Sequence, residues 1–260
     1  MVNVKHKWNT VQNNTFLLSN YPGLSFTTAN EIVGELKFRA FYDKKKCLIL
    51  INPTAISDNH YLIEDTYNIK IKLPDDPEKF LPLVYETGTR IVESGKKYNI
   101  TDFRDLHIYK DGSSVCLCPQ PQFIERILNG KSKSFPLLID ELVVPFFYQQ
   151  SYFERYGEWP IKNFSHGYPA IFEYYLRKKN NDENNNRLQL RLCIASLKML
   201  AQTEPNKYLE TLVESRKAIK STSKCFCGSG RKYKKCHRRS FSEEAKQGFI
   251  SFLADLRNKQ

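Results

Sequence analysis

Alternation of apolar and polar residues in the first hundred positions constrains this chain most. Residues 34–42, GELKFRAFY, show the period of two expected for a strand with one buried face. A polar DKKK turn leads to the apolar run at 47–52, CLILIN, so the two segments predict an antiparallel hairpin. Residues 68–74, NIKIKLP, predict a third strand, and residues 80–92, FLPLVYETGTRIV, contain a candidate fourth strand.

Helical patterns replace strand patterns after an irregular stretch around Cys116. Residues 135–156 are rich in aromatic and aliphatic side chains and are interrupted at Pro145. Residues 169–179, PAIFEYYLRKK, predict a short helix, and apolar residues recur at helical spacing over 188–199. Strands followed by helices predict an α+β fold.

Positive charge is concentrated near the end of the chain. The net charge is +12, and residues 215–242 hold ten Lys or Arg and no Asp or Glu. The rest of the chain then carries 30 basic and 28 acidic residues, a net charge of +2. This tail is therefore a basic module suited to phosphates, an acidic partner or an anionic surface.

The basic tail also contains four soft metal donors at close spacing. Cys225, Cys227, Cys236 and His237 have the pattern C-x-C-x8-C-H. Thiolates and imidazoles are the ligands of tetrahedral zinc, and a segment this polar has little core of its own. We therefore expect structural zinc here; the alternative is a solvated tail with incidental cysteines.

The string CFCGSGRKYKKCH, at 225–237, closely resembles the SEC-C motif, the zinc-binding element found at the end of the SecA translocation ATPase. The resemblance implies that Cys225, Cys227, Cys236 and His237 are the zinc ligands. It also implies a docking module that contacts an acidic protein or the ribosome.

The polar run NNDENNN, at 180–186, marks an expected domain boundary. We expect a main domain at 1–180, a helical connector at 181–221, and the zinc module with a terminal helix at 222–260. The first ten residues lack a signal-peptide core, and no apolar run is long enough to span a bilayer. We therefore expect a cytoplasmic protein whose cysteines are thiols or metal ligands.

A second Cys-x-Cys, Cys116 and Cys118, lies in a setting without zinc spacing. A turn, KDGSS, precedes it and the kinked LCPQP follows. A disulfide between residues two apart is strained, which leaves a nucleophile, buried inert thiols, or a metal site completed by His107 and His166. Cys193, on a predicted helix, is expected in the core.

The segment LHIYKDGSSVCL, at 106–117, resembles the active-site segment of ubiquitin-conjugating enzymes. His107 matches the histidine of that family's His-Pro-Asn, and Cys116 matches the catalytic cysteine. Upstream, IKIKLPDDPEKFLPLVYE resembles its strand, proline loop and strand. Downstream, residues 144–175 resemble its bacterial branch, with Tyr-rich helices and a Gly-x-Trp-Pro segment. The resemblance covers about residues 30–178.

This resemblance implies a four-strand antiparallel meander with flanking helices and cysteine-based acyl transfer. Cys116 would receive an activated C terminus, such as that of a ubiquitin-like protein, from an activating partner and pass it to an amine. The chain departs from the family in two ways. His107-Ile108-Tyr109 lacks the asparagine that steadies the oxyanion, and Cys118 is a rival thiol. His107 is expected to shape the loop or to act directly.

Three functions compete. The first is a thioester-forming transferase, which in the bacterial branch of the family implies a place in anti-phage defence. The second is an inactive adaptor of the same fold that binds a protein partner, an interpretation favoured by the missing asparagine. The third is a nucleic-acid or ribosome binder that acts through the basic tail.

Overall fold

The computed structural model describes most of the chain and divides it into two compact units. The described residues are 6–46, 48–54, 56, 61–100, 102–109, 114–161, 164–165, 167–181, 186–203, 222, 232, 235 and 242–257. The first unit comprises residues 1–118 and 127–163, and the second comprises 119–126 and 164–260. The domain boundaries expected from the sequence stay a prediction beside this division.

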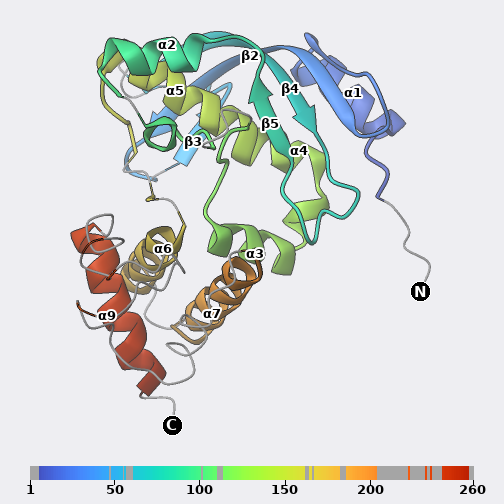
Figure 1. The fold of residues 1–260 in the computed structure, drawn as a ribbon. Helices are drawn as coiled ribbons and strands as arrows, with labels where there is room; N and C mark the ends of the chain where they lie inside the picture. Colours follow the sequence, from blue (N-terminus) through green and yellow to red (C-terminus); the bar gives the residue numbers. More distant parts are fainter. Residues whose placement is uncertain are drawn as a thin grey trace. The chain divides into compact units, whose positions relative to one another are not determined.

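The first unit is built on an antiparallel sheet of five strands in the described part of the chain (Figure 1). The strands are β1 (Leu24–Phe26), β2 (Glu31–Asp43), β3 (Leu48–Ile51), β4 (Leu62–Lys72) and β5 (Leu83–Glu86). Their order across the sheet is β1-β2-β4-β5, with β3 paired to β2 outside this path. The sequence prediction of a mixed α+β fold with an antiparallel sheet is confirmed.

The pairing of β2 differs from a simple run of the predicted strands. The predicted hairpin is present, since Ala40–Asp43 of β2 pairs antiparallel with β3. The long neighbour of β2 is β4, however, which pairs with it from Glu31 opposite Lys72 to Phe41 opposite Leu62. With only four residues, β3 covers just one end of β2, so the sheet follows chain order once β3 is set aside.

The first strand joins the sheet at a position that requires glycine. Gly34 of β2 lies opposite Leu24 of β1, with a φ of 134° that L side chains rarely adopt. A Cβ added to Gly34 would lie 2.1 Å from the carbonyl oxygen of Gly23. The two backbones therefore approach too closely at this point for any side chain.

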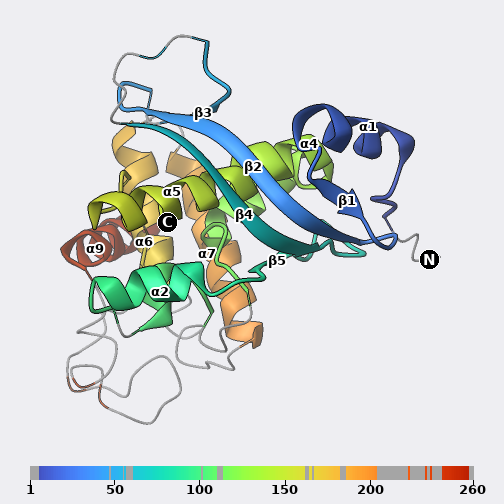
Figure 2. The ribbon, with the colours of Figure 1, turned by 90° about the horizontal axis from the view of Figure 1, so that it is seen from above.

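Helices pack against one face of this sheet (Figure 2). The helical elements of the first unit are α1 (Val11–Asn20), α2 (Arg90–Lys97), η2 (Phe103–Leu106), η3 (Lys131–Lys133), α4 (Phe135–Leu138), the π-helical η4 (Ile139–Val143) and α5 (Val144–Tyr156). Buried Leu36, Tyr67 and Ile71 of the sheet share one core with Val143 and Phe147. The predicted interruption at Pro145 is a change from π-helix to α-helix, because η4 ends at Val143 and Pro145 lies in the first turn of α5.

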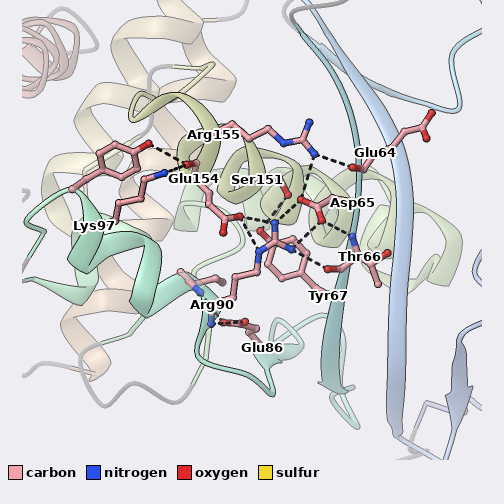
Figure 3. A network of polar contacts seen from close by, with 12 residues as sticks. Glu64, Asp65, Thr66, Tyr67, Glu86, Arg90, Lys97, Ser151, Glu154 and Arg155 are labelled. Carbon is pink, nitrogen blue, oxygen red and sulfur yellow. Dashed lines mark hydrogen bonds and ion pairs between the residues drawn. The ribbon is translucent and has the colours of Figure 1, made fainter.

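A polar network joins three elements of the first unit (Figure 3). Arg90 at the start of α2 donates to both carboxylate oxygens of Asp65 in β4, at 2.9 and 2.7 Å. It also donates to Glu154 of α5 at 2.8 Å, and its guanidinium lies 4.4 Å from the ring centre of Tyr67. Arg90 thus fixes α2 and α5 to the sheet by charge-assisted hydrogen bonds.

The second unit is helical in its described residues. It contains α6 (Tyr168–Asn181), α7 (Asn186–Thr203) and α9 (Glu243–Arg257), with α6 packed against both of the others. It also contains residues 120–126 of α3 (Gln120–Leu128). Gly248 of α9 lies so close to α6 that a Cβ would meet the carbonyl oxygen of Phe172 at 2.0 Å. Cys193 is fully buried in α7, as predicted. Within the described ranges, no helix combines the length and apolarity that crossing a membrane requires.

Candidate functional site

Cys116 lies in an irregular segment that is fixed to the last strand of the sheet. The backbone N–H of Val115 donates to the carbonyl oxygen of Val84 in β5, at 2.8 Å. Because β5 ends the strand order of the described sheet, this bond places Cys116 one residue beyond a sheet edge. A cysteine held in this way is positioned by the sheet without being part of it.

A short antiparallel ladder pairs the segment around Cys116 with the segment around His107. Ile108 and Val115 form an isolated antiparallel bridge, flanked by two hydrogen bonds. The N–H of Cys116 donates to the carbonyl oxygen of His107 at 2.7 Å. The N–H of Tyr109 donates to the carbonyl oxygen of Ser114 at 2.9 Å. Ile108 and Val115 are buried, whereas His107 and Cys116 are half-buried and Tyr109 is 49% exposed.

Contacts from α5 and the segment after it hold the start of this ladder. The buried side-chain amide of Gln150 in α5 donates to the carbonyl oxygen of Leu106 at 2.8 Å. His107 follows with a φ of 56°, uncommon for a residue with a side chain. Its ring meets Trp159 edge to face with centres 5.6 Å apart, and Trp159 stacks on Phe153. His107 thus contributes its carbonyl to Cys116 and its ring to Trp159.

The electrostatic setting of Cys116 combines burial with one hydroxyl donor. Cys116 is half-buried, and desolvation raises the pKa of its thiol. A hydrogen bond from the Tyr109 hydroxyl lowers that pKa in part. Desolvation and the nearby Cys116 in turn raise the pKa of Tyr109, so its hydroxyl stays protonated at neutral pH. At neutral pH the Cys116 thiol is therefore mostly protonated.

Cys118 has a different environment. It is buried, with 9% of the residue exposed, and neither Cys116 nor Cys118 forms a disulfide. Among the residues that the structure describes, no three His, Cys, Asp or Glu side chains gather as a metal site would require. His166, the fourth residue of the metal alternative, lies outside the described residues. Of the two thiols, Cys116 is thus the more accessible.

Sequence reasoning located Cys116 and His107 in one loop, and the structure brings their backbones together. Sequence reasoning did not identify Gln150 or Trp159 as the residues that hold this loop. The Gly-x-Trp-Pro segment was a signal for Trp159, since Gly157 ends α5 with a φ of 72° and turns the chain toward it. For Gln150 the signal was a pair of adjacent amides, Gln149 and Gln150, among the aromatic residues of α5, because a buried amide requires a partner.

The predicted zinc ligands, Cys225, Cys227, Cys236 and His237, lie outside the described residues. Comparison with protein-family models supports the SEC-C part of this prediction. A SEC-C motif model matches residues 222–239. All four predicted donors lie inside this match, and three thiolates with one imidazole form a donor set that suits zinc. No curated protein and no solved structure matches the chain.

The described helix after the SEC-C motif is firmly attached to the second unit. Ser242 caps α9, because its hydroxyl oxygen accepts from the N–H of Ala245 at 3.0 Å, and it donates to the buried Glu173 of α6. Arg177 of α6 pairs with Glu244 at 2.8 Å. Three residues after the matched end of the motif, Ser242 therefore ties the chain to α6 by a hydrogen bond.

Proposed function

We propose that this protein is a ubiquitin-conjugating-enzyme-like acyl carrier in which Cys116 forms the thioester. The observation that carries this proposal is the place of Cys116: a half-buried thiol fixed one residue beyond the edge of an antiparallel sheet. The strand order β1-β2-β4-β5 supports it, because these strands follow one another as in the meander of that family, with helices after the cysteine. The resemblance of residues 106–117 to that family's active-site segment points to the same reaction.

The chemistry requires little more than a reachable sulfur. The Cys116 thiolate attacks the carbonyl carbon of an activated C terminus, and the activator's thiolate leaves. An amine then attacks the new thioester, the carbon–sulfur bond breaks, and an amide forms. A thiol that is mostly protonated at rest is compatible with this role, because the thiolate needs to form only when the thioester partner is bound. His107 shapes the loop in this scheme.

The basic tail supplies the second part of the proposal. Cys225, Cys227, Cys236 and His237 would hold a structural zinc ion, which supplies folding energy to the SEC-C segment. The ten basic residues around it favour an acidic protein, the ribosome or a nucleic acid as the docking partner. We place this docking beside an activating-enzyme-like protein in the cytoplasm, and the likeness to the bacterial branch suggests a role in antiviral defence.

A second candidate is an inactive adaptor with the same fold, and one observation favours it. Burial raises the pKa of the Cys116 thiol, which lowers the fraction of reactive thiolate at neutral pH. The absence of the family's asparagine from His107-Ile108-Tyr109 points the same way. An adaptor would bind its protein partner without covalent chemistry, and its partner would bind equally well to a Cys116→Ala variant.

Intact-mass spectrometry on matched cysteine variants distinguishes the two. The full chain is incubated with ATP and a neighbouring adenylating activator, or with lysate of the source cells, before and after thiol reductant. We expect wild type and Cys118→Ala to gain a reductant-sensitive mass and Cys116→Ala to gain none. If the activator itself is charged and wild type gains no mass, the adaptor is correct.

A further inference from the structure

The turn that leads to Cys116 begins at Leu106, and two helices hold this residue. Leu106 is 2% exposed, and its side chain packs so closely on α2 that a Cβ added to Gly95 would lie 2.4 Å from it. Its carbonyl oxygen accepts a hydrogen bond of 2.8 Å from the side-chain amide of Gln150 in α5, a residue that is itself 2% exposed. Because α5 needs no side-chain amide to form, this buried bond serves the turn and not the helix.

The residue after Leu106 has a backbone conformation that needs such support. His107 has a φ of 56°, in the left-handed region, which a residue with a side chain keeps only where its surroundings hold it. Phe153 lies three residues after Gln150, on the same face of α5. The Phe153 ring stacks on Trp159 with centres 4.5 Å apart, and Trp159 meets the His107 ring edge to face. One face of α5 therefore holds both the backbone before His107 and the His107 ring.

The turn at His107 in its own place fixes the backbone of Cys116. The N–H of Cys116 donates to the carbonyl oxygen of His107 at 2.7 Å. A rotation of His107 out of its left-handed conformation turns this carbonyl away and breaks the bond. The bond from the Val115 N–H to Val84 then remains as the nearest tie to the sheet. The position of the Cys116 thiol thus depends on the turn that Gln150 holds.

We propose that Gln150 is a positioning residue that fixes the Cys116 thiol for acyl transfer by holding the turn at His107. The role in transfer rests on the proposed function, whereas the hold on the Cys116 backbone is measurable without it. A thioester on a fixed backbone meets the attacking amine in one geometry, and a loose thioester spends most of its time in unproductive ones. Loss of Gln150 therefore lowers the maximal rate of transfer and leaves the affinity for the amine unchanged.

Gln150→Met keeps the length of the side chain and removes the amide that serves the Leu106 carbonyl. The first measurement needs no activator: hydrogen exchange of single backbone amides in the full chain, followed by NMR. We expect Gln150→Met to speed exchange of the Cys116 N–H by about tenfold, the worth of one buried hydrogen bond. The N–H of Leu73, which donates to the carbonyl oxygen of Asn30 at 2.7 Å, should show no comparable change.

Gln149→Met is the matched control. The Gln149 amide donates to the carbonyl oxygen of Pro145 within α5, at 3.3 Å, so its loss should leave exchange at Cys116 unchanged. Unchanged exchange at Cys116 in Gln150→Met would overturn the positioning role. Equal acceleration at Cys116 and Leu73 would overturn it too, because it would show a general loss of stability.

The second measurement is single-turnover discharge of the preformed thioester over a range of lysine concentrations. We expect Gln150→Met to lower the maximal rate by about tenfold, with the lysine concentration for half-maximal rate unchanged. A normal maximal rate beside faster exchange at Cys116 would overturn the role in transfer. If wild type forms no thioester beside a charged activator, the proposed function fails, and faster exchange at Cys116 alone still establishes the hold of Gln150 on the turn.

Discussion

Replacing Arg90 should destabilise the first unit far more than replacing any exposed cation. Its guanidinium bridges Asp65 and Glu154, whose side chains are 13% and 30% exposed. Removal of one partner from a buried ion pair costs about 3–5 kcal/mol, and exposure of a third of the Arg90 side chain places Arg90→Ala at the low end, about 3 kcal/mol. For a unit of this size that loss corresponds to a fall in Tm of about 6–12 °C.

The assay is urea unfolding followed by tryptophan fluorescence. Trp8 and Trp159 are the two tryptophans of the chain and both belong to the first unit, so their signal reports on that unit alone. Lys131→Ala is the control, because its ion pair with Glu141 is exposed and is worth less than about 1 kcal/mol. Arg90→Lys should recover only part of the loss, since lysine lacks the planar fork. Equal stability of Arg90→Ala and Lys131→Ala would refute this reasoning.

Three further changes test other parts of the structure. Gly34→Ala should destabilise the first unit by about 2 kcal/mol or more, through backbone strain and collision with Gly23. The control Gly130→Ala, whose Cβ meets nothing within 4 Å, should lose about 1 kcal/mol. Similar urea midpoints for the two variants would contradict this. Burial alone would raise the pKa of Asp65, but its hydrogen bonds and the Arg90 charge lower that pKa below its usual value. The extra stability of wild type over Asp65→Asn should therefore be full above about pH 4 and shrink as the pH falls in acid titrations. Elemental analysis should find about one zinc per chain in wild type and none in Cys225→Ser; zinc retained by the variant would contradict the ligand set.

The strands show how far local pattern reaches. Alternation predicted β2 and the second half of β4, where burial follows the period of two. It missed the first half of β4 because Asp65 interrupts the apolar face there. That carboxylate is tolerated because Arg90, 25 residues later, pairs with it, and only the tertiary structure supplies this partner. The strand β1 was missed because three residues are too short to show a period.

The helices and the site follow the same logic. The sequence did not predict α1, in which only Leu17 is buried, although Thr10 is a cap signal that accepts from the N–H of Asn13. The sequence located Cys116 through its turn and prolines. The bridge between Ile108 and Val115, beside which the Cys116 N–H donates to the His107 carbonyl oxygen, is a contact that residue order alone does not determine.

Localisation of an acyl group on Cys116 tests the central claim most directly. Trypsin should release residues 111–126 as one peptide that contains both Cys116 and Cys118, and fragmentation at low pH separates the two positions. After incubation with ATP and a charged activator, we predict a thiol-labile acyl mass on Cys116. An acyl group on Cys118, or an unmodified peptide beside a charged activator, would contradict the assignment.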